Sequence, residues 1–142
     1  MIRRSPTPRG GSDRLGRARS FGVAFVFLWF LVGGIAHFAA TEMEMRMVPP
    51  VIPWPREAVL LSGVLELAGA LALLWRPTRR AAGIGLFLLT IAVTPVHVYM
   101  LQRPDLFPAI PPWALWLRLP VQAALLWLIL WSTWPKRQQV GR

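Results

Sequence analysis

The chain has 142 residues, enough for one domain of ordinary size, and 55% of them are hydrophobic. It carries 16 basic and six acidic residues but no cysteine, which excludes disulfides, cysteine-ligated metals and iron–sulfur clusters. The net charge of +10 does not indicate a nucleic-acid partner, because the basic residues lie in tails and connections between long apolar runs. This pattern predicts an integral membrane protein.

Four apolar segments are each long enough to cross the hydrocarbon layer of a bilayer, which takes about 20 residues in a helix. We expect them to be helical, because the bilayer interior offers their backbone groups no other partners. The prediction is an all-α, integral membrane four-helix bundle over residues 20–134, flanked by a disordered basic tail over 1–19 and a basic tail over 135–142. The expected helices cover residues 21–40, 58–75, 81–101 and 113–134.

Most of the basic residues fall on one side of this expected bundle. Twelve Lys and Arg lie in the two tails and in the turn over 76–80, whereas three lie in the connections over 41–57 and 102–112. Because the cytoplasmic segments of membrane proteins carry the excess of Lys and Arg, both termini are predicted to be cytoplasmic. We therefore expect a multi-pass protein of the bacterial cytoplasmic (inner) membrane that contacts lipid and no nucleic acid.

The two connections on the opposite side are long and rich in proline, which favours extended backbone over helix. The first of them, residues 41–57, also holds three methionines and Trp54. These apolar side chains fit two alternatives. The segment is either a connector that lies on the membrane surface or a lid over a site in the bundle.

Polar and ionisable residues within the expected helices are the candidate site, because they are costly in hydrocarbon and face the bundle interior or a wet cavity. At a rise of about 1.5 Å per residue, the ionisable ones lie about 4–12 Å below the surface on the side of the long connections. Pro95 and Pro120 lie at a similar depth and are predicted to kink their helices there. The candidate cluster consists of His37, Glu66, Thr94, His97, Arg118 and Gln122.

Glu66 and Arg118 are the predicted ion pair, either as a structural clamp or as an anchor for a polar ligand head. His97 is either a hydrogen-bonded core residue or a ligand contact, and His37 is expected to be an interfacial residue with a backbone partner. Two histidines at matching depth are also a ligand set for haem b, but the pattern is not specific to haem and we do not expect one. We expect no metal either, because the Arg118 charge would disfavour a cation.

Six different short motifs are distributed over all four expected helices and their connections. They are Gly34-Ile-Ala-His37-Phe, Met47-Val-Pro-Pro50, Ser62-Gly63-Val-Leu-Glu66, Arg79-Arg80-Ala-Ala-Gly83, Ala92-Val-Thr-Pro95-Val-His97-Val-Tyr99-Met100 and Arg118-Leu-Pro120-Val-Gln122. Through them the chain resembles the DoxX-like family of small four-helix bacterial membrane proteins. Some DoxX-like proteins are subunits of membrane oxidoreductases, including one that couples thiosulfate to quinone and one linked to superoxide detoxification.

This resemblance implies a shared site at the polar cluster, for which three hypotheses stand. The first is a subunit of a quinone-linked oxidoreductase or redox-stress complex, in which Glu66, His97 and Arg118 hold a quinone head and exchange its protons. Its electrons must come from partner subunits, because the sequence carries no flavin, nicotinamide or metal motif and no self-contained catalytic motif. The second is a non-enzymatic assembly or scaffold protein whose polar cluster only specifies packing. The third is a binder of a small lipid-like ligand.

Overall fold

The computed structural model describes residues 10–134, and their side chains from Arg14 onward. Within this range the chain is helical and contains no strand. The long elements are α1 (Gly10–Ala39), α3 (Pro55–Leu74), α4 (Arg79–Ala92) with α5 (Thr94–Gln102), and α6 (Pro112–Thr133). A short helix, α2 (Thr41–Met45), and a 3-10 turn, η1 (Pro104–Leu106), lie in the connections. The prediction of an all-α chain with four long apolar helical stretches is confirmed.

The helix boundaries differ from the predicted ones at several points. Helix α1 begins at Gly10, so residues 10–19 are helical and not part of a disordered tail. Extending a formed helix adds one hydrogen bond for each residue fixed, which makes such an extension easy. Helix α3 begins at Pro55 instead of residue 58, because proline suits the first turn of a helix. Residues 1–9 and the predicted tail over 135–142 lie outside the described residues.

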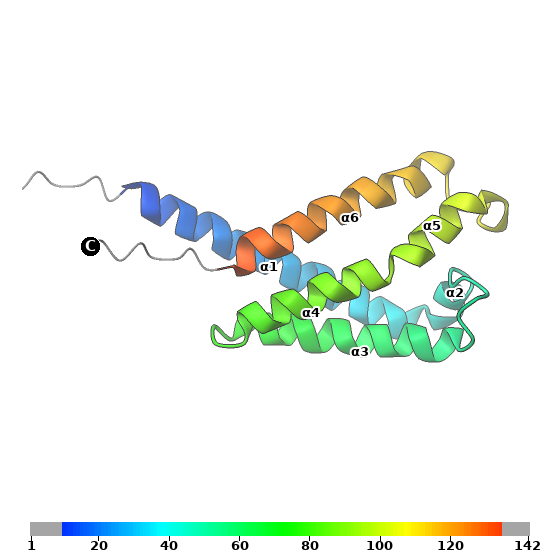
Figure 1. Ribbon diagram of the computed structural model, residues 1–142, viewed down its shortest axis with the longest axis horizontal. Coiled ribbons are helices and arrows are strands. Elements are labelled where there is room, and N and C mark those ends of the chain that lie inside the picture. The colour runs from blue at the N-terminus through cyan, green and yellow to red at the C-terminus, as the bar shows by residue number, and fades with distance from the viewer. Residues whose placement is uncertain (1–9, 135–142) are drawn as a thin grey trace, which may run out of the picture.

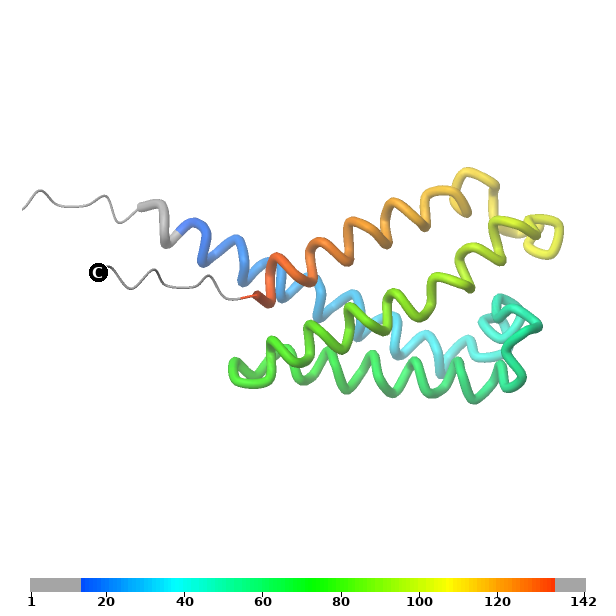
Figure 2. Tube along the Cα trace, viewed as in Figure 1, coloured from blue at the N-terminus to red at the C-terminus, as the bar shows by residue number. Residues whose placement is uncertain are grey.

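The helices form a bundle whose two ends differ (Figure 1). The described chain ends and the α3–α4 turn lie at one end, here called the terminal end, and α2 and η1 lie at the other, here called the loop end. Helices α1 and α4 each pack against both α3 and α6, so α3 and α6 face each other across the bundle. Towards the loop end, α5 and the first half of α6 diverge from α1 and α3 (Figure 2).

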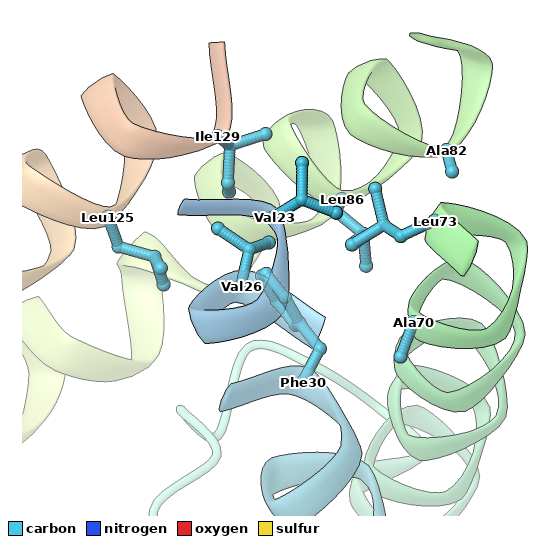
Figure 3. Close-up of a cluster of buried hydrophobic side chains, with 9 residues drawn as sticks. All are labelled: Val23, Val26, Phe30, Ala70, Leu73, Ala82, Leu86, Leu125 and Ile129. Atoms are coloured by element: carbon cyan, nitrogen blue, oxygen red, sulfur yellow. The ribbon is translucent and has the colours of Figure 1, made fainter. Parts of the chain in front are cut away.

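The terminal end is closely packed. Side chains from α1, α3, α4 and α6 meet there in one buried apolar cluster (Figure 3). Small residues let the helices approach, since a methyl group added at Gly22 would lie 2.9 Å from the Cβ of Ser132. The cluster consists of Val23, Val26, Phe30, Ala70, Leu73, Ala82, Leu86, Leu125 and Ile129.

A second, smaller cluster of buried side chains lies at the loop end. It consists of Met100 of α5, Phe107 just after η1, and Leu115 of α6. Met47, from the connection between α1 and α3, packs against it. The two clusters therefore sit at opposite ends of the bundle, and they leave the region between the diverging helices for the polar residues.

Candidate functional site

A cavity of about 780 Å³ occupies the loop-end half of the bundle. Its walls come from α1 to α6, and its surface is mainly apolar. Five of the six residues that the sequence singled out line it, and Thr94 lies behind Gln122, to which it is hydrogen-bonded. The five lining residues are His37, Glu66, His97, Arg118 and Gln122. The structure thus brings all six candidates to one place, although they come from four separate helical stretches.

The connection over residues 41–54, here called the lid segment, forms the wall of this cavity at the loop end. Met43, Glu44, Met47 and Val48 all contribute to the cavity wall. The segment is tied to α1 by the hydroxyl of Thr41, which donates to the carbonyl of His37 at 2.6 Å and starts the turn into α2. Of the two alternatives left open by the sequence, its position corresponds to the lid.

His37 lies between two glutamates that come from different elements. Its Nε2 is 3.4 Å from Oε1 of Glu66 on α3, and its Nδ1 contacts Oε2 of Glu44 on α2. All three side chains are mostly shielded from solvent. The carboxylates occupy opposite nitrogens of one ring, so the three groups do not converge on a common point as metal ligands would. In residues 10–134 no group of three or more His, Asp or Glu has a metal-binding arrangement.

The predicted ion pair between Glu66 and Arg118 was wrong. Among the described residues, the ionic partner of Glu66 is His37, and no ion pair joins Glu66 to Arg118 within 4 Å. Helix α3 packs on α1, whereas α6, which carries Arg118, stands on the far wall of the cavity. Gly33 of α1 provides the space for the carboxylate, because a methyl group there would lie 2.7 Å from Oε2 of Glu66.

Gln122 fastens α6 to the interruption between α4 and α5. Its Nε2 donates to the backbone carbonyl of Thr90 and to the hydroxyl of Thr94, both at 2.7 Å. Thr90 lies in the last turn of α4, where carbonyls have no donor from the same helix. The interruption falls next to Pro95, which has no N–H with which to continue the helix. The other predicted kink site, Pro120, lies within an uninterrupted α6.

These contacts fix the proton of His97. Because the Thr90 carbonyl can only accept, the amide nitrogen of Gln122 faces it and the amide oxygen faces His97. That oxygen is 2.6 Å from Nδ1 of His97, so Nδ1 is the donor. In a neutral imidazole the other nitrogen, Nε2, is then an acceptor. His97 therefore combines a core hydrogen bond with a free acceptor on a residue that lines the cavity.

The arrangement gives the cavity two chemically different walls. The wall formed by α1, α2 and α3 carries the Glu44–His37–Glu66 row, which can accept and release protons. The opposite wall carries His97 and Arg118, and among the described residues the Arg118 guanidinium has no carboxylate within 4 Å. A guanidinium offers several hydrogen-bond donors to oxygen atoms of a ligand. A molecule placed between the walls can thus meet donors on one side and proton acceptors on the other.

Sequence reasoning missed Glu44 and Thr90. Glu44 lies in a connection that also holds Glu42 and Arg46, so its charge did not distinguish it. Thr90 contributes its backbone carbonyl, which no side-chain pattern reveals. Pro95 indicated an interruption at this level, but the carbonyl whose donor it removes is that of Ile91, four residues earlier, and not that of Thr90.

Comparison with other proteins gives one match. No curated protein and no solved structure matches the chain. A family model described as a domain of unknown function, DUF8561, matches residues 26–135. The matched range runs from the middle of α1 past the end of α6 and includes every cavity residue named above. The chain therefore belongs to the DUF8561 family.

Proposed function

We propose that this protein spans the bacterial cytoplasmic membrane four times and binds the polar head of a lipid-soluble ligand, with a quinone as the ligand class. Four helical stretches long and apolar enough to cross a bilayer support the membrane placement. So do large apolar side chains that face outward along the helices, such as Val32, Leu61 and Leu88, because a continuous apolar surface is stable against lipid. The excess of arginine in the segments predicted to be cytoplasmic supports this orientation of the chain.

Reporter fusions test this placement directly. Fusions after Trp54 and Asp105 are expected to report the periplasm, and a fusion after Thr78 is expected to report the cytoplasm. A fusion after Thr78 that reports the periplasm would overturn the orientation.

The cavity is the observation that carries the ligand proposal. Small-molecule sites in proteins are mainly apolar concavities of about 300–1,000 Å³ with a few convergent polar groups. This cavity has a volume of about 780 Å³, an apolar lining and polar groups that converge from several helices. A bundle whose polar residues only fixed packing would fill such a space with side chains, as the terminal end does.

A quinone matches the polar groups in both of its redox states. Its ring is apolar, its carbonyl oxygens accept hydrogen bonds, and the hydroxyls of the reduced form donate them. Arg118 supplies donors for a carbonyl, and Nε2 of His97 supplies an acceptor for a hydroxyl. Electrons for the quinone would come from partner oxidoreductase subunits, in line with the resemblance to DoxX-like proteins.

Residues in the walls of the cavity support entry of the ligand from the lipid phase. Trp29 of α1, Leu61 of α3 and Leu117 of α6 line the cavity, yet 44%, 59% and 49% of their surfaces are exposed. Apolar residues that are both lining and exposed indicate an opening between helices that faces the bilayer. The lid segment covers the loop end instead. A ligand dissolved in the membrane therefore has a direct path to the cavity.

The test is a thermal-shift series on protein in lipid nanodiscs, with short-chain ubiquinone and menaquinone analogues. We expect wild type to be stabilised by at least one analogue and His97→Ala to lose that shift while remaining folded. Asp105→Asn, which changes an exposed residue at the loop end, is the control and should behave as wild type. If no quinone stabilises wild type, the ligand proposal fails and a scaffold role becomes the leading one.

A further inference from the structure

Glu44, His37 and Glu66 form a continuous row of titratable groups. Glu44 contacts one ring nitrogen of His37, and Glu66 lies at hydrogen-bond distance from the other, 3.4 Å away. The three residues come from α2, α1 and α3, which are packed together at this point. The proposed contacts with the ligand do not involve Glu44. The contact of Glu44 with the His37 ring therefore needs a separate explanation.

The row also crosses a boundary between two environments. Glu44 belongs to α2, which lies outside the four apolar stretches and has no buried residue. Glu66 lies inside the apolar stretch Pro55–Leu74, eleven residues after its start, or about 16 Å along the helix axis. His37 joins the two carboxylates near the end of α1. The contacts therefore lead from the water-facing loop end into the apolar half of the cavity.

We propose that Glu44, His37 and Glu66 are a proton relay that connects the aqueous phase at the loop end with the cavity. Chains of Asp, Glu and His within membrane segments are the groups that carry protons in membrane proteins. The relay deepens the proposed function, because it provides the proton route that a bound quinone would need, and it rests on the proposed membrane placement. Its test uses no ligand.

The transfer balances with one proton moved at each end. Protonated Glu44 gives a proton to Nδ1 of His37, and Nε2 of the same ring gives a proton to the carboxylate of Glu66. Glu44 ends as the carboxylate and Glu66 as the acid, while the imidazole has passed from one neutral tautomer to the other. Release of the Glu66 proton into the cavity, exchange of the two tautomers and reprotonation of Glu44 from water together restore the starting state, and the net result is one proton moved from the water to the cavity.

The experiment follows protonation of Glu66 by time-resolved infrared spectroscopy after a pH jump, on protein in nanodiscs. The carbonyl band of the protonated acid is assigned by its loss in Glu66→Gln. We expect Glu44→Gln to slow the appearance of this band on the order of a hundredfold, the low end of what a positioned proton-transfer group contributes. Glu42→Gln is the matched control, because Glu42 is an exposed glutamate of the same short helix.

Two further measurements separate a relay from a structural effect. Glu44→Asp keeps the charge but shortens the side chain, so it should slow the band as well if contact with His37 matters. Added formate should restore the rate in Glu44→Gln, because a small acid can replace the missing proton donor. An unchanged rate in folded Glu44→Gln and Glu44→Asp overturns the relay, and so does a Glu66 band that never titrates. If the thermal-shift series with quinones fails, the infrared result still tests the relay, because it is measured without a ligand.

Discussion

Gln122 of α6 donates a hydrogen bond to the backbone carbonyl of Thr90, which lies 2.7 Å away in the last turn of α4. The contact joins α6, which is uninterrupted, to the end of α4, where the chain is interrupted before α5. From this point towards the loop end, α5 and α6 diverge from α1 and α3 (Figure 2). The same amide holds Thr94 on the other side of the interruption and His97 one turn further on. One buried side chain thus maintains both the helix break and the orientation of a cavity histidine.

We therefore expect Gln122→Leu to destabilise the protein by about 1–3 kcal/mol, because the buried Thr90 carbonyl and His97 would lose their partner. Leucine matches glutamine in size, so the loss reports the hydrogen bonds and not a void. Gln102→Leu, at an exposed position at the end of α5, should leave the melting temperature in nanodiscs unchanged. Equal melting temperatures for the two variants would show that the network contributes nothing to stability.

A double-mutant cycle should assign the ionic partner of Glu66. We expect Glu66→Gln and His37→Asn to be non-additive in the free energy of unfolding, since each removes the same contact. Glu66→Gln and Arg118→Gln should add within about 0.5 kcal/mol, as residues without a shared contact do. Coupling to Arg118 in place of His37 would restore the pairing predicted from the sequence and contradict the arrangement of α1 and α3.

The contact between α1 and α3 should depend on Gly63. A methyl group there would lie 2.8 Å from Cβ of His37 and 3.2 Å from the carbonyl oxygen of Gly34. We expect Gly63→Ala to destabilise the protein by about 1–3 kcal/mol, the usual range for overpacking. Gly85→Ala adds the same methyl group where no atom lies within 4 Å, so it should be neutral or stabilising. Chemical unfolding of both variants provides the comparison.

Asp105 should titrate at an unusually low pH. Hydrogen bonds from the Arg103 guanidinium stabilise its carboxylate and lower the pKa of Asp105 below the ordinary aspartate value. A lowered pKa favours the folded protein above the unfolded-state pKa, and this contribution disappears as the pH falls through the folded-state value. NMR titration of Asp105 should show the lowered midpoint, and Arg103→Gln should return it to the ordinary value. Both side chains are exposed, so this contribution is small and Arg103→Gln should lower stability only slightly at neutral pH.

The sequence predicted the helices and the depth of the polar groups but not which of these groups pair. Apolar length identifies each long helix, and a rise of about 1.5 Å per residue places His37, Glu66 and Arg118 in the same half of the bundle, about 4–12 Å from the ends with the long connections. Depth says nothing about the order of helices around the bundle, and that order puts Glu66 beside His37 and opposite Arg118. Gly33 and Gly63 let α1 and α3 approach closely and so bring Glu66 beside His37. A glycine in a sequence does not indicate which helix packs against it, so this pairing could not be predicted.

The uneven packing of the bundle gives different parts of the cavity wall different supporting contacts. At the terminal end four helical stretches share one interlocked core, whereas at the loop end α5, η1 and the start of α6 hold together through a cluster of their own. The part of the cavity wall that α5 contributes therefore takes its position from the second cluster and not from the core. A substitution in the second cluster is expected to displace His97 of α5 while it leaves the contacts of the core in place.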